Sequence, residues 1–203
     1  EKDTVGGLAE VHVFGCPIGL GSCVQADLKL DARLGAAVLS IQAFKAVEIG
    51  LGRDCAFRPG SEVHDPIAFD ASQRNRPSLG FVRSRNNAGG IEGGMTNGMP
   101  IVVTGTMKPI STLLRGLPSV DLNTKEAVHS AYERSDVCAL SAASVVMENT
   151  VAFEVARVFR EKFGGDSMIE VTAQYHAYLD LCRRLPITPP DETSGLEAEQ
   201  TEA

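Results

Sequence analysis

The glycine-rich segment 86–98, which reads Asn-Asn-Ala-Gly-Gly-Ile-Glu-Gly-Gly-Met-Thr-Asn-Gly, constrains the fold of this chain more than any other stretch. Glycine has no Cβ, so it adopts positive φ freely and lets another backbone or a ligand approach closely. Such a segment is typical either of a tight turn packed against a neighbouring element or of a nest of backbone N–H groups that holds an anion. Its composition alone leaves both interpretations open.

Short strands are predicted on both sides of this segment. Residues 10–14 alternate around Val11 and Val13 before a loop rich in glycine, and residues 44–49 end at Gly50. Residues 101–107 form an apolar stretch directly after the glycine-rich segment. Such short apolar stretches between glycines are typical of strands that end in turns.

Three helices are predicted from apolar residues spaced three and four apart. The first runs over 31–43, with Asp31 as its N-cap. The second covers 142–163 and stops at a pair of glycines. The third follows Ser167, whose spacing from Glu170 is that of a capping box.

In three stretches the apolar residues show neither helical nor strand-like spacing. The polar, turn-rich stretch 53–85 is either an excursion over a site or a disordered surface loop, and 120–133 fits a helix or a short hairpin. Residues 186–203 are rich in proline and then in acidic residues, so we expect a disordered tail there, after a body formed by residues 1–185.

The order of these elements favours an α+β fold in layers, with long helices in the C-terminal third. No predicted strand leads into a Gly-x-Gly-x-x-Gly segment or a Gly-Lys-Ser/Thr phosphate loop. A doubly wound dinucleotide-binding fold is therefore disfavoured.

Composition excludes several classes of function. The formal net charge is −7, and much of it lies in the acidic tail, so no nucleic-acid surface is indicated. Five cysteines without a Cys-x-x-Cys pair and four scattered histidines predict neither a disulfide framework nor a metal site. No apolar stretch approaches the ~20 residues of a membrane span and no signal peptide is recognised, so we expect a cytoplasmic protein.

One candidate for anion binding follows the predicted strand 101–107. It consists of Lys108, Pro109, Ile110, Ser111 and Thr112. An ammonium group and two hydroxyls at a strand end suit a phosphate, whereas the alternative is a surface lysine in a polar turn.

A second candidate precedes the helix 142–163. Arg134 and Asp136 lie two residues apart, so their side chains point the same way in extended backbone. Arginine binds anions through two parallel hydrogen bonds and aspartate accepts protons. The alternative is that Asp136 or Ser135 caps the following helix.

Several motifs, taken in order, resemble the chorismate synthase family. They are Gly19-Leu-Gly-Ser22, Leu30-Asp-Ala-Arg-Leu34, Ser40-Ile-Gln-Ala43 with Val47-Glu-Ile-Gly50, the segment 86–100, and Met107-Lys-Pro-Ile-Ser-Thr112. The segments 135–138 and 161–167 resemble the actinobacterial-type branch. The resemblance covers the chain from Asp3 to Tyr178.

The resemblance implies the family's β-α-β sandwich, here in part, and a homotetramer. It also implies a lyase of the shikimate pathway of aromatic amino-acid biosynthesis, which eliminates phosphate in an anti-1,4 sense from 5-enolpyruvylshikimate 3-phosphate to give chorismate. Reduced FMN is required without net redox change, and NADPH takes part only if the protein has an intrinsic flavin reductase activity. In this chemistry the cofactor supplies electron density, and the protein fixes the positions of the reacting groups and stabilises the leaving anion.

The resemblance also assigns residues by motif. The flavin contacts it implies are Gln42, Ala43, Gly93, the five residues from Lys108 to Thr112, and Arg134. Arg134 also faces the substrate, and Asp136 resembles the family's acid that assists proton movement, so these two are the expected catalytic residues.

The sequence departs from the family in ways that bear on activity. The family's N-terminal half, with its Gly-Glu-Ser-His-Gly motif, is not in this sequence, so we expect a fragment that is inactive alone. The alternative is a non-catalytic relic, or an FMN-binding or assembly module. Cys23 and Ser135 stand where histidine is common, and Ser141 where proline is common.

Overall fold

The computed structural model describes residues 3–131 and 136–184. The chain divides into two compact units, residues 1–162 (unit 1) and residues 163–203 (unit 2). The predicted tail 186–203 lies outside the described residues, as do Arg134 and Ser135.

Unit 1 is built on a three-stranded sheet. The strands β1 (Gly7–Val13), β7 (Ile101–Met107) and β2 (Phe44–Ile49) lie in the order β1-β7-β2, and both outer strands run antiparallel to β7. The predicted strands at 44–49 and 101–107 are confirmed. The first strand begins at Gly7, earlier than predicted, because its ladder with β7 continues to the end of that strand.

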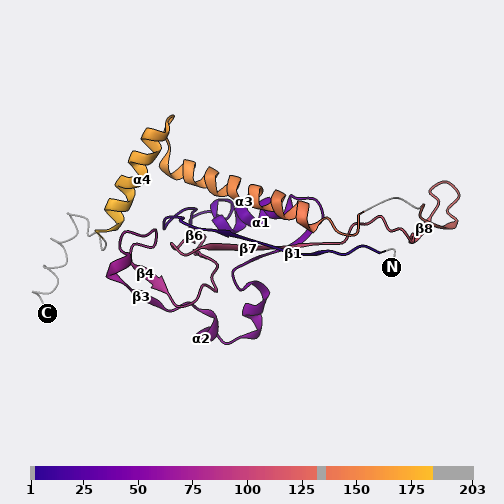
Figure 1. Cartoon of the computed structure of the whole chain (residues 1–203), viewed down its shortest axis with the longest axis horizontal. Helices are drawn as coiled ribbons and strands as arrows, with labels where there is room; N and C mark the ends of the chain where they lie inside the picture. The colour runs from indigo at the N-terminus through magenta and orange to yellow at the C-terminus, as the bar shows by residue number, and fades with distance from the viewer. Residues whose placement is uncertain (1–2, 132–135, 185–203) are drawn as a thin grey trace, which may run out of the picture. The chain divides into compact units, whose positions relative to one another are not determined.

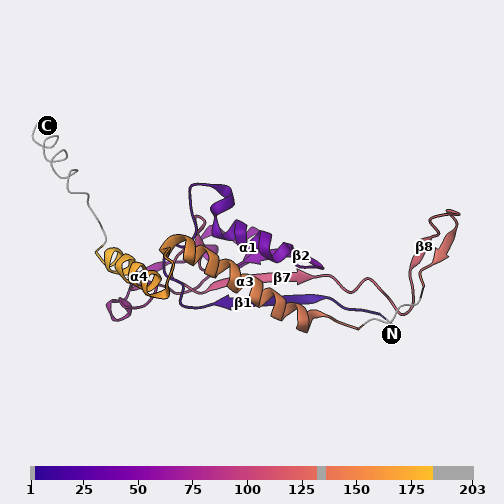
Figure 2. The same ribbon diagram turned by 90° about the horizontal axis from the view of Figure 1, so that it is seen from above.

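Two helices cover one face of this sheet. Figure 1 shows α1 (Leu30–Leu39) and α3 (Leu140–Phe163) on the same side of the strands, and Figure 2 shows them running alongside each other over the sheet. The side chains between the layers are fully buried: Leu30, Leu34, Val38, Ile101, Val103, Met147 and Val151 are 0% exposed. One sheet and one helical layer confirm the α+β class, with long C-terminal helices.

The start of α1 differs from the prediction. Asp31 is not its N-cap, because the helix begins at Leu30 and the cap residue is Lys29. The Asp31 carboxylate instead accepts a hydrogen bond from the backbone N–H of Ala32, at 2.9 Å. The free N–H of Leu30 is satisfied from elsewhere in the chain, since it donates to the carbonyl oxygen of Gly94 at 2.9 Å.

The stretch 53–85 is ordered, so the disordered alternative is wrong. It contains two short helical turns, η2 (Gly52–Phe57) and α2 (Gly60–Val63), and a hairpin of β3 (Ile67–Phe69) and β4 (Phe81–Arg83). A third turn, η3 (Ala71–Gln73), lies inside the hairpin loop. Figure 1 shows this excursion on the side of the sheet away from α1 and α3.

The stretch 120–133 contains a hairpin, which decides between the two predicted alternatives. Its strands are β8 (Pro118–Val120) and β9 (Ala127–His129). The helix alternative fails because Lys125 takes a φ of 63°, which a helix cannot accommodate.

Unit 2 contains α4 (Met168–Cys182). The predicted capping box is confirmed, since Ser167 accepts from the N–H of Glu170 and the Glu170 carboxylate accepts from the N–H of Ser167. Phe163 packs edge-on against Tyr175 and Tyr178, with ring centroids 5.4 Å apart in both pairs.

Among the residues that the structure describes, no helix combines the length and apolar character needed to cross a membrane.

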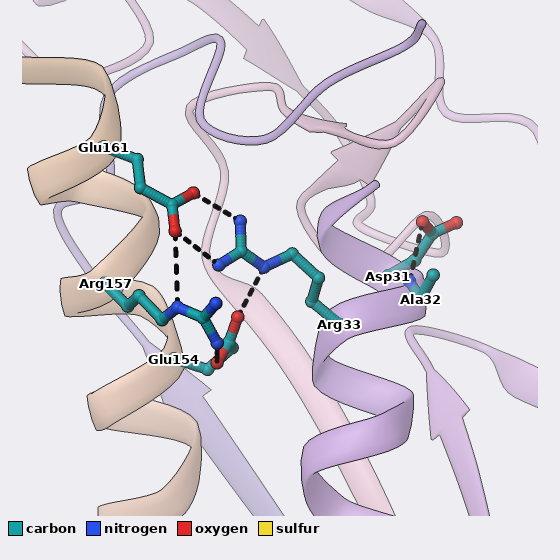
Figure 3. Close-up of polar contacts among 6 residues, drawn as sticks. All are labelled: Asp31, Ala32, Arg33, Glu154, Arg157 and Glu161. Atoms are coloured by element: carbon teal, nitrogen blue, oxygen red, sulfur yellow. Dashed lines mark hydrogen bonds and ion pairs between the residues drawn. The ribbon is translucent and has the colours of Figure 1, made fainter. Parts of the chain in front are cut away.

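A charged cluster joins α1 to α3 (Figure 3). Arg33 of α1 donates through Nε to Glu154 and through both terminal nitrogens to the carboxylate of Glu161. The side chains of Arg33 and Glu154 are only 9% and 10% exposed, whereas that of Glu161 is 47% exposed. These hydrogen bonds hold the pKa of Glu161 below its usual value. Buried charges need such partners, because an unpaired buried charge is strongly unfavourable.

We predict that Glu154→Ala lowers the free energy of unfolding by about 3 kcal/mol, because it leaves the buried Arg33 without its buried partner. Glu161→Ala should lower it by about 1 kcal/mol or less, since that carboxylate is half in solvent. Chemical denaturation of both variants measures the difference. Equal effects of the two substitutions would show that burial of the ion pair does not matter.

Candidate functional site

A cavity of about 600 Å³ lies in unit 1 where β7 ends. Three segments of the chain form its wall, and the residues that line it are Ser40, Ile41, Gln42, Ala43, Met107, Lys108, Ile110, Ala139, Ala142, Ala143 and Val146. The volume lies within the range of cofactor sites, and the lining is largely apolar with few polar groups, as in most such sites.

The first turn of α3 forms one side of this cavity. Ala139, Ala142 and Ala143 are small, so they bring the backbone of the helix start close to the open space. The first N–H groups of a helix lack partners within it and carry a partial positive charge. Together with the ammonium group of Lys108, this helix end favours a bound anion.

The turn between α1 and β2 forms a second side. The backbone N–H of Lys108 donates to the carbonyl oxygen of Ala43 at 2.9 Å, so the turn is fastened to the end of β7. Ala43 has a φ of 70°, a conformation that an alanine rarely adopts and that persists only where its surroundings enforce it. The strained residue therefore lies in the cavity wall itself.

The residues before β1 bond to the third wall segment, at Ile110, and to the residues just before α3, at Val137. The hydroxyl of Thr4 donates to the carbonyl oxygen of Ile110 at 2.6 Å, and Thr4 is 8% exposed. The N–H of Val5 donates to the carbonyl oxygen of Val137 at 2.8 Å. Sequence reasoning did not identify Thr4 or Val5, because their partners lie more than 100 positions away and no local pattern marks them.

The structure brings together only part of the predicted set. Gln42, Ala43, Lys108 and Ile110 line the cavity, whereas Pro109, Ser111 and Thr112 belong to the same segment but do not line it. Arg134 lies outside the described residues.

Asp136 is exposed and lies three positions before the cavity residue Ala139. It is not the N-cap of the following helix, because α3 begins at Leu140. Ser135, the other residue named for that capping role, lies outside the described residues.

Gly93 lies elsewhere in unit 1. It is in the turn between β5 (Ile91–Glu92) and β6 (Met95–Thr96), and its neighbour Gly94 accepts a hydrogen bond from the first residue of α1. The cavity lies at the other end of α1, a helix of 10 residues, or about 15 Å away. A single copy of the chain therefore does not place Gly93 beside Lys108.

The glycine-rich segment is used mainly for close backbone packing. A Cβ on Gly89 would lie 2.3 Å from the nitrogen of Gly50, and a Cβ on Gly50 would lie 2.1 Å from the carbonyl oxygen of Asn87. Asp65 fixes the start of the segment by accepting from the N–H groups of Asn87 and Ala88, both at 2.9 Å. At these positions, the tight-turn interpretation applies.

The described residues offer little other catalytic chemistry. No group of three or more His, Cys, Asp or Glu side chains among them could hold a metal ion. Burial raises the pKa of the Cys16 thiol to about 11, so it stays protonated and is a poor nucleophile. The cavity itself combines an apolar lining with the ammonium group of Lys108 and the start of α3, which suits an anionic ligand with a large apolar part.

Comparisons with known proteins agree with this arrangement. A family model described as chorismate synthase matches residues 1–159. Chorismate synthases of Geobacter metallireducens and Geobacter sulfurreducens are each 59% identical over 182 residues, and that of Thermoanaerobacter pseudethanolicus is 55% identical over 179. A crystal structure of a chorismate synthase superposes with a TM-score of 0.72 at 40% identity, over 89% of this chain.

These matches cover less than half of each relative's own length. The chain spans about half the length of the curated relatives that it matches, since 89% of it aligns with 46% of each Geobacter protein. The solved structure is covered to 45%.

We predict that Gly89→Ala lowers the free energy of unfolding by about 3 kcal/mol, because the new Cβ would meet the backbone of Gly50. Gly93→Ala is the matched control: its φ of 59° resembles the 61° of Gly89, but nothing lies within 4 Å of its Cβ. It should lower the free energy by about 1 kcal/mol, through backbone strain alone. Thermal or chemical unfolding measures both, and equal losses would exclude a role for close packing.

Proposed function

The chain belongs to the chorismate synthase family, and we propose that unit 1 supplies one wall of a reduced-FMN site of that enzyme. The proposed reaction is the anti-1,4-elimination of phosphate from 5-enolpyruvylshikimate 3-phosphate to give chorismate. The observation that carries the proposal is the cavity of about 600 Å³ at the end of β7, because four of the motif-assigned flavin contacts line it.

The cavity residues fit the chemistry of FMN. The apolar wall of the cavity, which includes Ile41, Ala142 and Val146, suits a planar ring system. Lys108 and the start of α3 offer positive charge to a phosphate. We propose that Gln42, Ala43 and the segment 108–112 hold the cofactor, with Arg134 as a further contact.

Reduced FMN, when bound, supplies electron density to the reaction without net redox change. The protein's residues would position the reactants and stabilise the departing phosphate. Lys108 offers a positive charge beside the cavity. Asp136, exposed and three positions from the wall residue Ala139, would accept or return the proton that leaves with phosphate, and Arg134 would hold the anionic substrate.

Activity is proposed for the intact protein and not for unit 1 alone. The relatives are about twice as long as the matched part, so the rest of the site would come from sequence that this chain does not contain. We propose that the intact protein is a homotetramer. NADPH would be needed only for an intrinsic reduction of the flavin.

A second candidate function follows from the partial coverage: an FMN-binding or assembly module without catalysis. The DNA directly before Glu1 distinguishes the two. An in-frame Gly-Glu-Ser-His-Gly region there supports the enzyme, and an upstream stop codon with no partner gene supports the module.

We predict that Lys108→Ala weakens FMN binding about tenfold, because it removes a cation opposite an anionic cofactor. Fluorescence titration of the intact protein with FMN measures the change. Lys45→Ala is the matched control, since it removes the same charge from an exposed residue outside the cavity. An unchanged affinity in Lys108→Ala would refute the role of this lysine.

We predict that Asp136→Asn slows turnover of the intact protein by about 100-fold while FMN still binds, because the amide cannot accept a proton. Steady-state kinetics and flavin titration on the same sample separate the two effects. Turnover at the wild-type rate would exclude Asp136 from proton transfer.

A further inference from the structure

The residues just before β1 bond to two parts of the chain that carry proposed flavin-site residues. We call residues 3–6 the strap. The first part is the segment 107–115, which begins at the end of β7 and includes the proposed contacts 108–112. The second is the segment 136–140, which includes Asp136 and leads into α3. In the sequence the hairpin of β8 and β9 lies between these two parts, so the covalent connection alone does not fix their spacing.

Thr4 bonds to the first segment through its side chain. The hydroxyl donates to the carbonyl oxygen of Ile110 at 2.6 Å, and the residue is 8% exposed. A buried hydroxyl needs such a partner. Because a trans peptide is planar, with its C=O and N–H on opposite sides, the bond also directs the N–H of Ser111 away from Thr4. One hydrogen bond thus sets the orientation of a backbone donor inside the segment 108–112.

Contacts on both sides of Thr4 keep the strap close to the same segment. A Cβ on Gly6 would lie 2.3 Å from the carbonyl oxygen of Met107, so only glycine lets the two backbones approach this closely. The Asp3 carboxylate lies 2.9 Å from the guanidinium group of Arg115, but their side chains are 41% and 58% exposed. Such an exposed ion pair contributes little by itself. The buried hydroxyl of Thr4 is therefore the polar contact that fixes the segment.

The next residue of the strap bonds to the second segment. The N–H of Val5 donates to the carbonyl oxygen of Val137 at 2.8 Å, and Val137 directly follows Asp136. Two positions further along, β1 contacts α3, because a Cβ on Gly7 would lie 2.6 Å from the side chain of Leu140. Adjacent residues of the strap thus bond to both segments, and the spacing of the segments depends on them.

We propose that Thr4 is a positioning residue of the flavin site. Through the carbonyl oxygen of Ile110 it holds the segment 108–112 in the conformation that binds the phosphate of the cofactor. The strap as a whole sets this segment relative to Asp136. Donors that are held in place before a ligand arrives bind it more tightly, because less freedom is lost on binding. The inference rests on the proposed function, which supplies the ligand.

A purely structural role for Thr4 is the alternative. A buried hydroxyl with one hydrogen bond stabilises the folded state whatever the neighbouring segment does. Its loss would then make unfolding easier and leave the FMN affinity of the folded protein unchanged. The two roles therefore predict different results for folded protein.

Two substitutions at position 4 form a matched pair. Thr4→Ala and Thr4→Ser both remove the methyl group, but only the alanine variant loses the hydroxyl. In the intact protein, Thr4→Ala should weaken FMN binding about fivefold, and Thr4→Ser should stay within about twofold of the wild type. Fluorescence titration measures both. A wild-type affinity in Thr4→Ala, or equal losses in the two variants, would overturn the proposal.

Hydrogen exchange of the intact protein without FMN tests the same bond directly. Thr4→Ala should speed amide exchange about fivefold in peptides that cover 108–114 and leave peptides of β7 unchanged, whereas Thr4→Ser should change neither. Unchanged exchange at 108–114 in the alanine variant would overturn the proposal. An equal increase in both regions would show a general loss of stability and would also overturn it.

A third variant serves where Thr4→Ala does not fold. Thr4→Val fills the space of the threonine side chain but has no hydroxyl to donate. The same weakening of FMN binding and the same local increase in exchange are expected, and wild-type values in both measurements would overturn the proposal.

The two measurements separate this inference from the proposed function. If the intact protein binds no FMN but Thr4→Ala still speeds exchange at 108–114 alone, the proposed function fails and the positioning of the segment by Thr4 stands. If FMN binds and Thr4→Ala binds it as the wild type does, the inference fails alone.

Discussion

The pairing of β7 with strands on both sides is the constraint on which unit 1 depends. The side chains of β7 alternate, so Ile101, Val103 and Met107 are buried beneath the helices. Gly105 completes this face, and a Cβ there would lie 2.5 Å from the ring of Phe44 and 3.0 Å from the sulfur of Met147. A shift in register by one residue would expose the whole face. The same register places Lys108 at the strand end, directly beside the cavity.

The route of the chain around this sheet explains the glycine-rich segment. The N–H of Gly50, directly after β2, donates to the carbonyl oxygen of Val102, and the N–H of Val102 donates to the carbonyl oxygen of Gly89. Three backbones thus meet without side chains between them, which only glycine permits at 50 and 89. Sequence chemistry left open whether these glycines served a turn or a ligand. In the fold, they allow the long excursion 52–85 to leave the sheet and return to it.

The sequence predicted what depends on local periodicity and missed what depends on distant partners. β2, β7 and the capping box of α4 follow from patterns within a few residues, and the structure confirms them. The Asp31 cap was wrong because Gly94, 64 positions away in the chain, satisfies the N–H of Leu30. The cavity was only partly predictable: motifs identified Gln42 and Lys108, but no local signal marks Thr4. Such pairs form only after the sheet brings the segments together.

Helix α3 connects the stability of unit 1 to the geometry of its cavity. Its later turns are fixed by Val151 in the core and by the ion pair of Glu154 with Arg33. Its first turn is in contact with β1, since a Cβ on Gly7 would lie 2.6 Å from the side chain of Leu140. A continuous helix held at both ends places its first N–H groups beside the same cavity that Lys108 lines. The positive end of the cavity is therefore set by the packing of the helical layer, before any ligand arrives, which is the pre-organisation that anion binding requires.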